Sequence, residues 1–474
     1  MSGGKARLSI PADIGAEMTP GVRAFVELLL ARIEALEAEV RELKAELVTT
    51  RKTPRNSSLP PSTEHPHAKP VPQKEKSGKK PGGQTGHSKH ERALIPADQC
   101  QALVTLKPNA CRRCGERLSG SDSEPLRHQV WELPEITPFI TEYQRHRLTC
   151  SGCGTSTCGD LPAGVPQGQA GPRLVALTAL LMGCFKQSKR RVALFLTEVL
   201  NQPCSPGWVV KLQAQATAAL APAYEELTAQ LPAAKVLGID ESPTKQGPQK
   251  SWLWTFVADS YTVFALRTTR AATVLQDLLT DAYNGVVNCD RAKMYWNVGR
   301  PQWCWAHLKR DFQALVDHPD HQLKRLGRDL MRPTKELFRL WSRCRDGTLT
   351  RRGFERLMPP IRREIESLLL RGHGTAADGM CRELYKHRAW LWTFVDVDGV
   401  EPTNNASERA LRPAVIWRKL SFGTKSASGS RFVETILTVV ETCHRQSRNS
   451  FDYLTAALEA HFAGQPTPSL LAGV

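Results

Sequence analysis

Three acidic residues have the type and the setting that metal-dependent displacement chemistry requires: Asp240, Asp290 and Glu408. Each aspartate ends a short apolar run, which is how a buried strand of an α/β sheet reads, and such sheets place their chemistry at the C-terminal ends of strands. Glu408 lies in the first turns of a predicted helix. Such carboxylates could hold two Mg²⁺ ions roughly 3.5–4 Å apart, which neutralise charge on the attacking and departing oxygens. The alternative for each acid alone is that it only terminates or caps its own element.

Other polar residues that lie close to these acids in the sequence could take part in the same chemistry. Glu241 is a possible fourth acid, but on a strand its side chain would point away from that of Asp240, so we predict a structural role for it. Several cations could clamp phosphates, although ordinary surface or core roles suit each of them equally well. These are His307, Arg291, Lys293, Arg409 and Arg412.

The order of the three acids and the blocks that flank them resemble the DDE transposases of insertion-sequence family sixty-six, over nearly the whole chain. The matching blocks are Asp240-Glu241-Ser242 with Trp252-Leu253-Trp254, Asp290 with Cys304-Trp305-Ala306-His307-Leu308, Thr403–Pro413, Arg418-Lys419, Phe422-Gly423 and Glu441-Thr442-Cys443. One stretch departs from the family, because members often have Thr-Gly-Trp where this chain has Ser242-Pro243-Thr244. We therefore expect the loop after Glu241 to be shaped differently.

The resemblance implies an α/β RNase H-like catalytic core that cleaves DNA and transfers the freed strand into a target. It implies that Asp240 bridges two Mg²⁺ (or Mn²⁺) ions, with Asp290 on one ion and Glu408 on the other. The implied partners are the terminal repeats of the element, target DNA and small accessory proteins of the same element. Two other functions stay open: a DNA-binding protein that has lost catalysis, and an RNase H-like nuclease or resolvase without strand transfer. A DNA-binding protein that has lost catalysis would be expected to have an altered carboxylate, and none of the three is altered. A nuclease or resolvase would not need the N-terminal coiled coil, the basic arm and the zinc module.

The composition also indicates a polyanion partner. The chain has 474 residues, enough for two to four domains, and a formal net charge of +17. Such a balance is typical of nucleic-acid binding, although abundant lysine can also serve solubility alone. The 13 cysteines of a chain without a signal peptide indicate a reducing, cytoplasmic compartment, where they are free thiols or metal ligands. No apolar run is long enough to cross a bilayer, so no membrane partner is expected.

Residues 1–50 are predicted to form a coiled coil that makes a homodimer or a higher oligomer. A heptad pattern places Val26, Ile33, Val40 and Leu47 on one position and Val22, Leu29, Leu36 and Leu43 on the other. β-Branched residues at the first position with leucine at the second favour a parallel two-stranded coil. The alternative is an amphipathic helix that docks on its own chain.

Residues 51–98 are predicted to be a basic disordered linker. This stretch is rich in Pro, Gly, Ser and Lys, so it cannot form a periodic element, and we interpret it as an arm along the DNA backbone or a solvated tether.

Residues 99–165 are predicted to be a zinc-binding module. Two Cys-x-x-Cys pairs could supply four thiolates for one tetrahedral zinc ion. Residues 129–133 and 139–148 could form a hairpin between the pairs. The four thiols are those of Cys111, Cys114, Cys150 and Cys153.

Residues 166–234 are predicted to be a helical, helix-turn-helix-like DNA-binding domain. Ser205-Pro206 has the pattern of an N-cap followed by proline at the first helical position. We expect DNA contacts from the basic start of the first helix and from the second helix. The residues concerned are Lys189, Arg190, Arg191, Lys211 and Gln213, and two packed helices without a DNA role are the alternative.

The remaining residues are predicted to form the catalytic core with an all-α insertion. The first part, residues 235–306, should be a strand, an antiparallel meander, a crossover helix and a parallel strand that carries Asp290 beside Asp240. A last short strand is expected over 302–305. Residues 307–400 read as an all-helical insertion, and residues 401–474 return to the core with Glu408 and two amphipathic helices.

Overall fold

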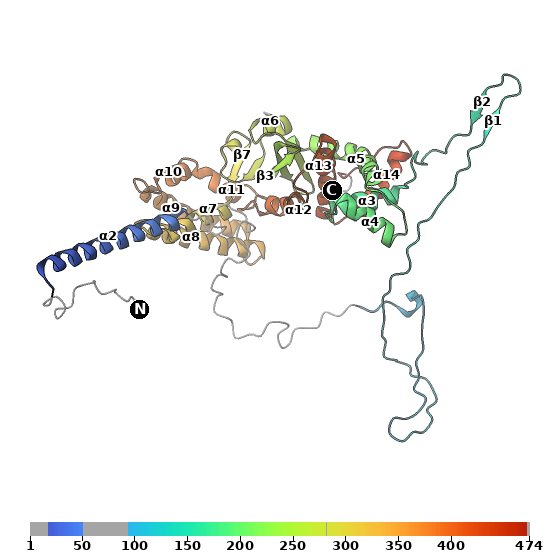
Figure 1. The fold of residues 1–474 in the computed structure, drawn as a ribbon, viewed down its shortest axis with the longest axis horizontal. Helices are drawn as coiled ribbons and strands as arrows, with labels where there is room; N and C mark the ends of the chain where they lie inside the picture. Colours follow the sequence, from blue (N-terminus) through green and yellow to red (C-terminus); the bar gives the residue numbers. More distant parts are fainter. Residues whose placement is uncertain (1–17, 51–92, 281, 472–474) are drawn as a thin grey trace.

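A mixed sheet of five strands forms the centre of the protein, as seen in a computed structural model that describes residues 18–50, 93–280 and 282–471. Its strand order is β5-β4-β3-β6-β7 (Figure 1). The strands are β3 (Val236–Gln246), β4 (Gln249–Val257), β5 (Thr262–Arg267), β6 (Val286–Cys289) and β7 (Arg300–Trp303). Strands β3, β4 and β5 are an antiparallel meander, while β6 pairs parallel to β3 and β7 parallel to β6. This arrangement confirms the predicted meander and crossover, and it is compatible with an RNase H-like core.

The strand sequences explain why the sheet is the centre of the core. Strand β4 is buried almost throughout its second half, where Trp254 and Phe256 are fully enclosed. Aromatic and β-branched side chains of this kind favour a pleated, buried surface. The last strand differs from the prediction, because it ends at Trp303 and Trp305 already begins a helix.

Helices pack against the sheet, and further helices lie on both sides of it along the long axis of the molecule (Figure 1). Before the sheet come α3 (Pro172–Gly183), α4 (Lys189–Val199) and α5 (Pro206–Ala229), and α6 (Thr273–Leu279) lies in the crossover. Between β7 and the last three helices the chain is helical, as predicted: α7 (Trp305–Asp317), α8 (His321–Arg345), α9 (Arg351–Arg371), α10 (Asp378–Lys386) and α11 (Thr393–Asp396). The chain then returns to the sheet with α12 (Asn405–Ser421), α13 (Ala427–Arg445) and α14 (Ser450–Phe462).

Strand β5 is at the edge of the sheet, and side chains of helix α13 accept hydrogen bonds from the backbone N–H groups along that edge. The Phe264 N–H donates to Thr438 Oγ1 at 2.9 Å, the Thr262 N–H to Thr442 Oγ1 at 3.1 Å, and the Leu266 N–H to the Glu434 carboxylate at 2.8 Å. The acceptors are four residues apart in α13, a rise of about 6 Å, and the donors are two residues apart in β5, a rise of about 6.7 Å. The two spacings are similar, so successive donors and acceptors stay aligned. The edge strand therefore loses the unpaired N–H groups that would otherwise recruit another strand.

Replacing Thr438 by valine is expected to lower the free energy of unfolding by roughly 1–3 kcal/mol, because the shape is kept while a buried N–H loses its acceptor. Thr435→Val is the matched control. Thr435 is as fully buried in the same helix, but its hydroxyl has no hydrogen-bond partner among the described residues. Urea unfolding should separate the two variants, and equal stability of both would show that the hydrogen bonds from β5 to α13 contribute nothing.

The helices before the sheet begin as the sequence predicts. Ser205 caps α5 by accepting the Trp208 N–H, and Pro206 is the first helical residue. Ser188 caps α4 in the same way through the Arg191 N–H. Helices α3, α4 and α5 pack on one another, and α3 and α5 also contact α13 and α14.

Residues 93–165 form an extended segment outside the helical body, with one short hairpin of β1 (Arg147–Thr149) and β2 (Ser156–Cys158) (Figure 1). The predicted hairpin of residues 129–133 with 139–148 is wrong, since 129–133 form no strand. Thr149 instead pairs with Ser156 across the turn that holds Cys150 and Cys153. Gly154 has a φ of +72° in that turn, so local turn chemistry selects the nearer partner.

Helix α2 (Pro20–Thr50) is a single long helix over the predicted heptads. Its seam residues Val22, Leu29, Ile33, Leu36 and Val40 are exposed. The predicted linker falls largely on residues 51–92, which lie outside the described residues. In the described part of the chain, no helix is long and apolar enough to span a membrane.

Candidate active site

The register of the sheet brings Asp240 and Asp290 together. Gly238 on β3 pairs with Asn288 on the parallel strand β6. Each aspartate comes two residues after its member of this pair, so both leave neighbouring strands at the same level and on the same face. The Glu241 N–H donates to Asp240 Oδ1 at 3.0 Å, and the Ala292 N–H donates to Asp290 Oδ1 at 2.8 Å. The structure thus places the two strand-end acids side by side.

Residues 401–404 fasten the start of α12 to the same edge of the sheet. Asn288 Nδ2 donates to the backbone oxygens of Glu401 (2.7 Å) and Thr403 (3.2 Å). Asn404 Nδ2 donates to the Ile239 carbonyl at 2.7 Å, and the Asn404 N–H donates to Cys304 Sγ at 3.1 Å. Two buried amides therefore fix where the helix begins, and with it the position of Glu408 in its first turn.

A glycine on β3 allows α12 to approach the strand closely. A Cβ atom at Gly238 would lie 2.4 Å from Ser407 Oγ and 2.9 Å from Asn404 Oδ1. Ser407 is fully buried in this contact and directly precedes Glu408. The absence of a side chain at position 238 thus allows the short distance between α12 and β3.

Burial and neighbouring carboxylates determine the electrostatics of Asp240. Burial raises the pKa of Asp240 well above its usual value, and the negative charges of Glu241, Asp290 and Glu408 raise it further. Carboxylates brought together out of water repel one another, and a cation between them relieves the repulsion. The donors are hard oxygens, so Asp240, Asp290 and Glu408 fit divalent ions such as Mg²⁺.

Glu241 is directed to other partners and has the environment of a structural ion pair. Its side chain is only 3% exposed, and Arg270 lies 2.5 Å from its Oε1 atom. The Tyr295 hydroxyl donates to the other carboxylate oxygen. Burial raises the pKa of Glu241, while the Tyr295 hydrogen bond and the Arg270 charge lower it.

Two side chains of α7 meet Glu408. His307 Nε2 lies 3.8 Å from Glu408 Oε1, and Arg310 Nη2 lies 4.0 Å from Oε2. Burial lowers the pKa of His307, and the Glu408 charge partly opposes that shift. The sequence pointed to His307 as a phosphate ligand but not to its contact with Glu408, nor to Arg310. The spacing of His307 and Arg310 by one helical turn was the only local signal.

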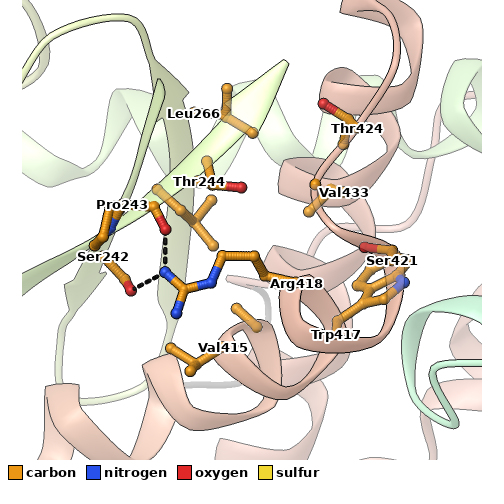
Figure 2. Close-up of a pocket in the computed structure, with 13 residues that line it drawn as sticks. Ser242, Pro243, Thr244, Leu266, Val415, Trp417, Arg418, Ser421, Thr424 and Val433 are labelled. Carbon is orange, nitrogen blue, oxygen red and sulfur yellow. Dashed lines mark hydrogen bonds between the residues drawn. The ribbon is translucent and has the colours of Figure 1, made fainter. Parts of the chain in front are cut away.

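The stretch Ser242-Pro243-Thr244 continues β3, so the expected loop after Glu241 is a strand. Figure 2 shows this stretch facing α12 across a pocket, with Arg418 between them. Arg418 Nη1 donates to Ser242 Oγ at 2.9 Å and also to the Pro243 carbonyl. Further along, the Thr424 N–H donates to the Lys245 carbonyl at 2.9 Å. Helix α12 therefore follows β3 along its length and is attached at both of its ends.

The predicted phosphate ligands have different surroundings. Lys189, Arg190, Arg191, Lys211, Lys293, Arg409 and Arg412 are exposed. Gln213 is 8% exposed and packs inside the helical unit, which corrects the expectation that its amide contacts DNA. The helical period explains this, because Gln213 falls on the same face as the buried residues Val209 and Ala216. Arg291 forms ion pairs with Asp311 (2.9 Å) and Glu383 (3.2 Å), so it ties the sheet to the helical segment.

Each Cys-x-x-Cys pair forms a tight turn of the kind that holds zinc. The Gly115 N–H donates to the Cys111 carbonyl, and the Gly154 N–H donates to the Cys150 carbonyl, both at 2.9 Å. The backbone N–H of Cys114 lowers the pKa of Cys111, and Thr155 lowers that of Cys153. Among the described residues, the group of three or more possible ligands within 4.8 Å of one another is Cys304, His307 and Glu408, so neither the four cysteines nor the three acids lie that close together. The two turns are therefore formed separately, as half-sites.

Comparison with known proteins gives two family matches and two relatives. The model of the Transposase IS66 family matches residues 167–431, and a family of unknown function, DUF6444, matches residues 11–93. The uncharacterized protein y4hP of Sinorhizobium fredii is 25% identical over 421 residues, which is 78% of this chain and 73% of that protein. The uncharacterized protein y4qI of the same organism is 23% identical over 256 residues, so this chain spans 46% of its length.

Proposed function

Since this chain belongs to the transposase IS66 family, we propose that it binds the ends of its element and catalyses metal-dependent DNA cleavage and strand transfer in an RNase H-like core. Asp240, Asp290 and Glu408 are the proposed catalytic residues. The family membership implies a role in DNA transposition. The proposal of DNA cleavage and strand transfer as the individual steps is based on the residues of the candidate active site.

The observation that supports the proposal is the shared level of Asp240 and Asp290 on neighbouring parallel strands, to whose ends the start of α12, the helix of Glu408, is hydrogen-bonded. The three residues come from distant parts of the sequence, so only the tertiary fold can bring them to the same end of the sheet. Divalent ions held there would stabilise the charge that develops on the attacking and leaving oxygens of a phosphodiester. No side chain needs to act as a nucleophile, because water and then a DNA 3′-hydroxyl can take that role.

The chain's own residues orient these groups. Asn288 and Asn404 hold the α12 start, and Cys304 accepts an N–H from the same segment. Arg310 Nη2 lies 4.0 Å from the other Glu408 carboxylate oxygen, Oε2, and its positive charge favours that orientation of the carboxylate. A rigid support of this kind is what in-line displacement requires, because the reacting atoms must stay aligned.

The direct experiment is incubation of the protein and Mg²⁺ with DNA that carries the ends of its element and with a target plasmid. We expect nicks that expose 3′-hydroxyls at the ends, followed by joined products. Nicks without joining would favour a nuclease or resolvase. Binding without either product would favour a DNA-binding protein that has lost catalysis.

We also place DNA contacts on the exposed basic start of α4, at Lys189, Arg190 and Arg191, and on Lys211 of α5. These exposed side chains carry positive charge on the helices before the sheet, which suits contacts to phosphates. Arg409 and Arg412 lie on the exposed face of α12, beyond Glu408. They are proposed to contact DNA at the active site.

Cys111, Cys114, Cys150 and Cys153 are proposed to bind one structural zinc ion, which would join the two half-sites. Purified protein should therefore contain one zinc ion per chain by elemental analysis. Cys150→Ser should lose it, because three thiolates hold zinc less tightly than four. Cys158→Ser is the matched control, since Cys158 lies in β2 outside both turns. Zinc that is absent, or that survives Cys150→Ser, would contradict the site.

Helix α2 is proposed to join two copies of the chain through its exposed heptad seam. Replacing Leu36 and Leu43 together by lysine should leave monomers in sedimentation, because two charges would be buried at the seam. Ala31→Lys with Ala35→Lys adds the same charge away from the seam and should keep the oligomer. If the seam variant keeps its oligomer, α2 has another role.

A further inference from the structure

Three donor atoms of different chemistry meet at the base of α12. Cys304 Sγ, a ring nitrogen of His307 and a carboxylate oxygen of Glu408 all lie within 4.8 Å of one another. Cys304 precedes α7 and His307 lies in its first turn, whereas Glu408 comes from α12. In the described ranges of the chain, this is the one group of three or more such side chains with that spacing.

The separation of His307 and Glu408 fits an ion between them better than a direct hydrogen bond. His307 Nε2 and Glu408 Oε1 are 3.8 Å apart, which is beyond hydrogen-bond distance. Glu408 Oε1 is shielded from solvent and has no hydrogen-bond partner among the described residues. Two ligand atoms that each lie about 2.1 Å from one ion can be up to about 4.2 Å apart. The observed distance lies inside that limit.

Cys304 has a different task in this group. Its side chain is fully buried, and its sulfur accepts the Asn404 N–H at 3.1 Å. That hydrogen bond fastens the segment before α12 to the start of α7. The Cys304 sulfur thus helps to position both helices. His307 Nε2 and Glu408 Oε1 are then the two possible ligand atoms that face one another.

We propose that His307 is a ligand of the divalent ion that Glu408 holds, which makes this ion site a mixed nitrogen–oxygen site. The inference rests on the proposed function, because it assumes that Glu408 binds a catalytic ion. Mg²⁺ prefers oxygen ligands, whereas imidazole is a common ligand of first-row transition ions. The site is therefore expected to select Mn²⁺ over Mg²⁺ more strongly than carboxylates alone would.

The test uses Mn²⁺ as the probe and the full chain. Pulsed electron paramagnetic resonance of bound Mn²⁺ should show coupling to an imidazole nitrogen. His307→Gln should remove that coupling and weaken Mn²⁺ binding about tenfold or more, while the Mg²⁺ concentration that displaces Mn²⁺ should fall. His321→Gln is the matched control, because His321 is an exposed histidine in the first turn of α8. Cys304→Ser should keep the nitrogen coupling.

The outcomes separate this inference from the proposed function. Nitrogen coupling that His307→Gln removes and His321→Gln keeps would support the inference. Mn²⁺ binding that depends on Glu408 but shows no nitrogen coupling would overturn it and leave the proposed function standing, with His307 as a plain ion-pair partner of Glu408. Mn²⁺ binding that is indifferent to Asp240→Asn and Glu408→Gln would overturn both. Circular dichroism of each variant shows whether the fold is kept.

Discussion

Asp240→Asn, Asp290→Asn and Glu408→Gln are each expected to reduce nicking and joining of element ends by at least about a thousandfold. Each change keeps the size of the side chain and removes its charge. The lost charge matters because two divalent ions at short range repel one another unless anionic ligands lie between them. Removing all three carboxylates should be hardly worse than removing one, since they act as a unit. Gel-based assays of cleavage and strand transfer measure both steps.

The internal control for the triad is Glu241→Gln. Glu241 is as close to Asp240 in the sequence as a residue can be, but its carboxylate is paired with Arg270 and Tyr295. We expect Glu241→Gln to retain the chemistry and to lose some stability, because Arg270 loses its partner. DNA binding should survive in all four variants. A Glu408→Gln protein that still cuts and joins DNA would disprove the triad.

Gly238→Val is expected to lower the same activity about a hundredfold without touching a catalytic group. Even a Cβ atom at this position would lie 2.4 Å from Ser407 Oγ, so the larger side chain must push α12 away from β3. Glu408 follows Ser407 directly, and a displacement of roughly 1 Å in a catalytic group can cost two orders of magnitude in rate. Thermal unfolding should show that the protein remains folded.

A second substitution shows whether the effect comes from this contact. Ser407→Gly in the Gly238→Val background removes the side chain that clashes and should restore part of the activity, as a double-mutant cycle would show. Gly379→Ala is the neutral control, because a Cβ atom there meets nothing within 4 Å. If Gly238→Val is fully active, the spacing of α12 and β3 does not control the site.

Local patterns were sufficient for the elements and for part of the site. Apolar runs of strand length predicted β3, β4, β5 and β6, and a crossover of ordinary length predicted the parallel pair that carries Asp240 and Asp290. Caps such as Ser205 marked a helix start to the residue. These features are readable because burial and capping leave a periodic or a local trace in one stretch of sequence.

The sequence also misled where a long-range choice was involved. It allowed a hairpin of residues 129–133 with 139–148, but the chain pairs Thr149 with Ser156 across a nearer turn. It favoured Gln213 as a DNA ligand, but the packing of α5 buries that amide. In both cases one sequence could not show which of several compatible partners would be taken.

By itself, then, the sequence determined the kinds of element, their order and the acids that the site would need, because these depend on residue type and short-range periodicity. The tertiary structure decided where the helix of Glu408 begins relative to the strands of the two aspartates, through the amides of Asn288 and Asn404 and the space left by Gly238. It also decided that His307 faces Glu408 and that α13 satisfies the edge of β5. Such contacts join residues far apart in the chain, and they depend on the shapes of two packed surfaces, which neither stretch of sequence contains alone.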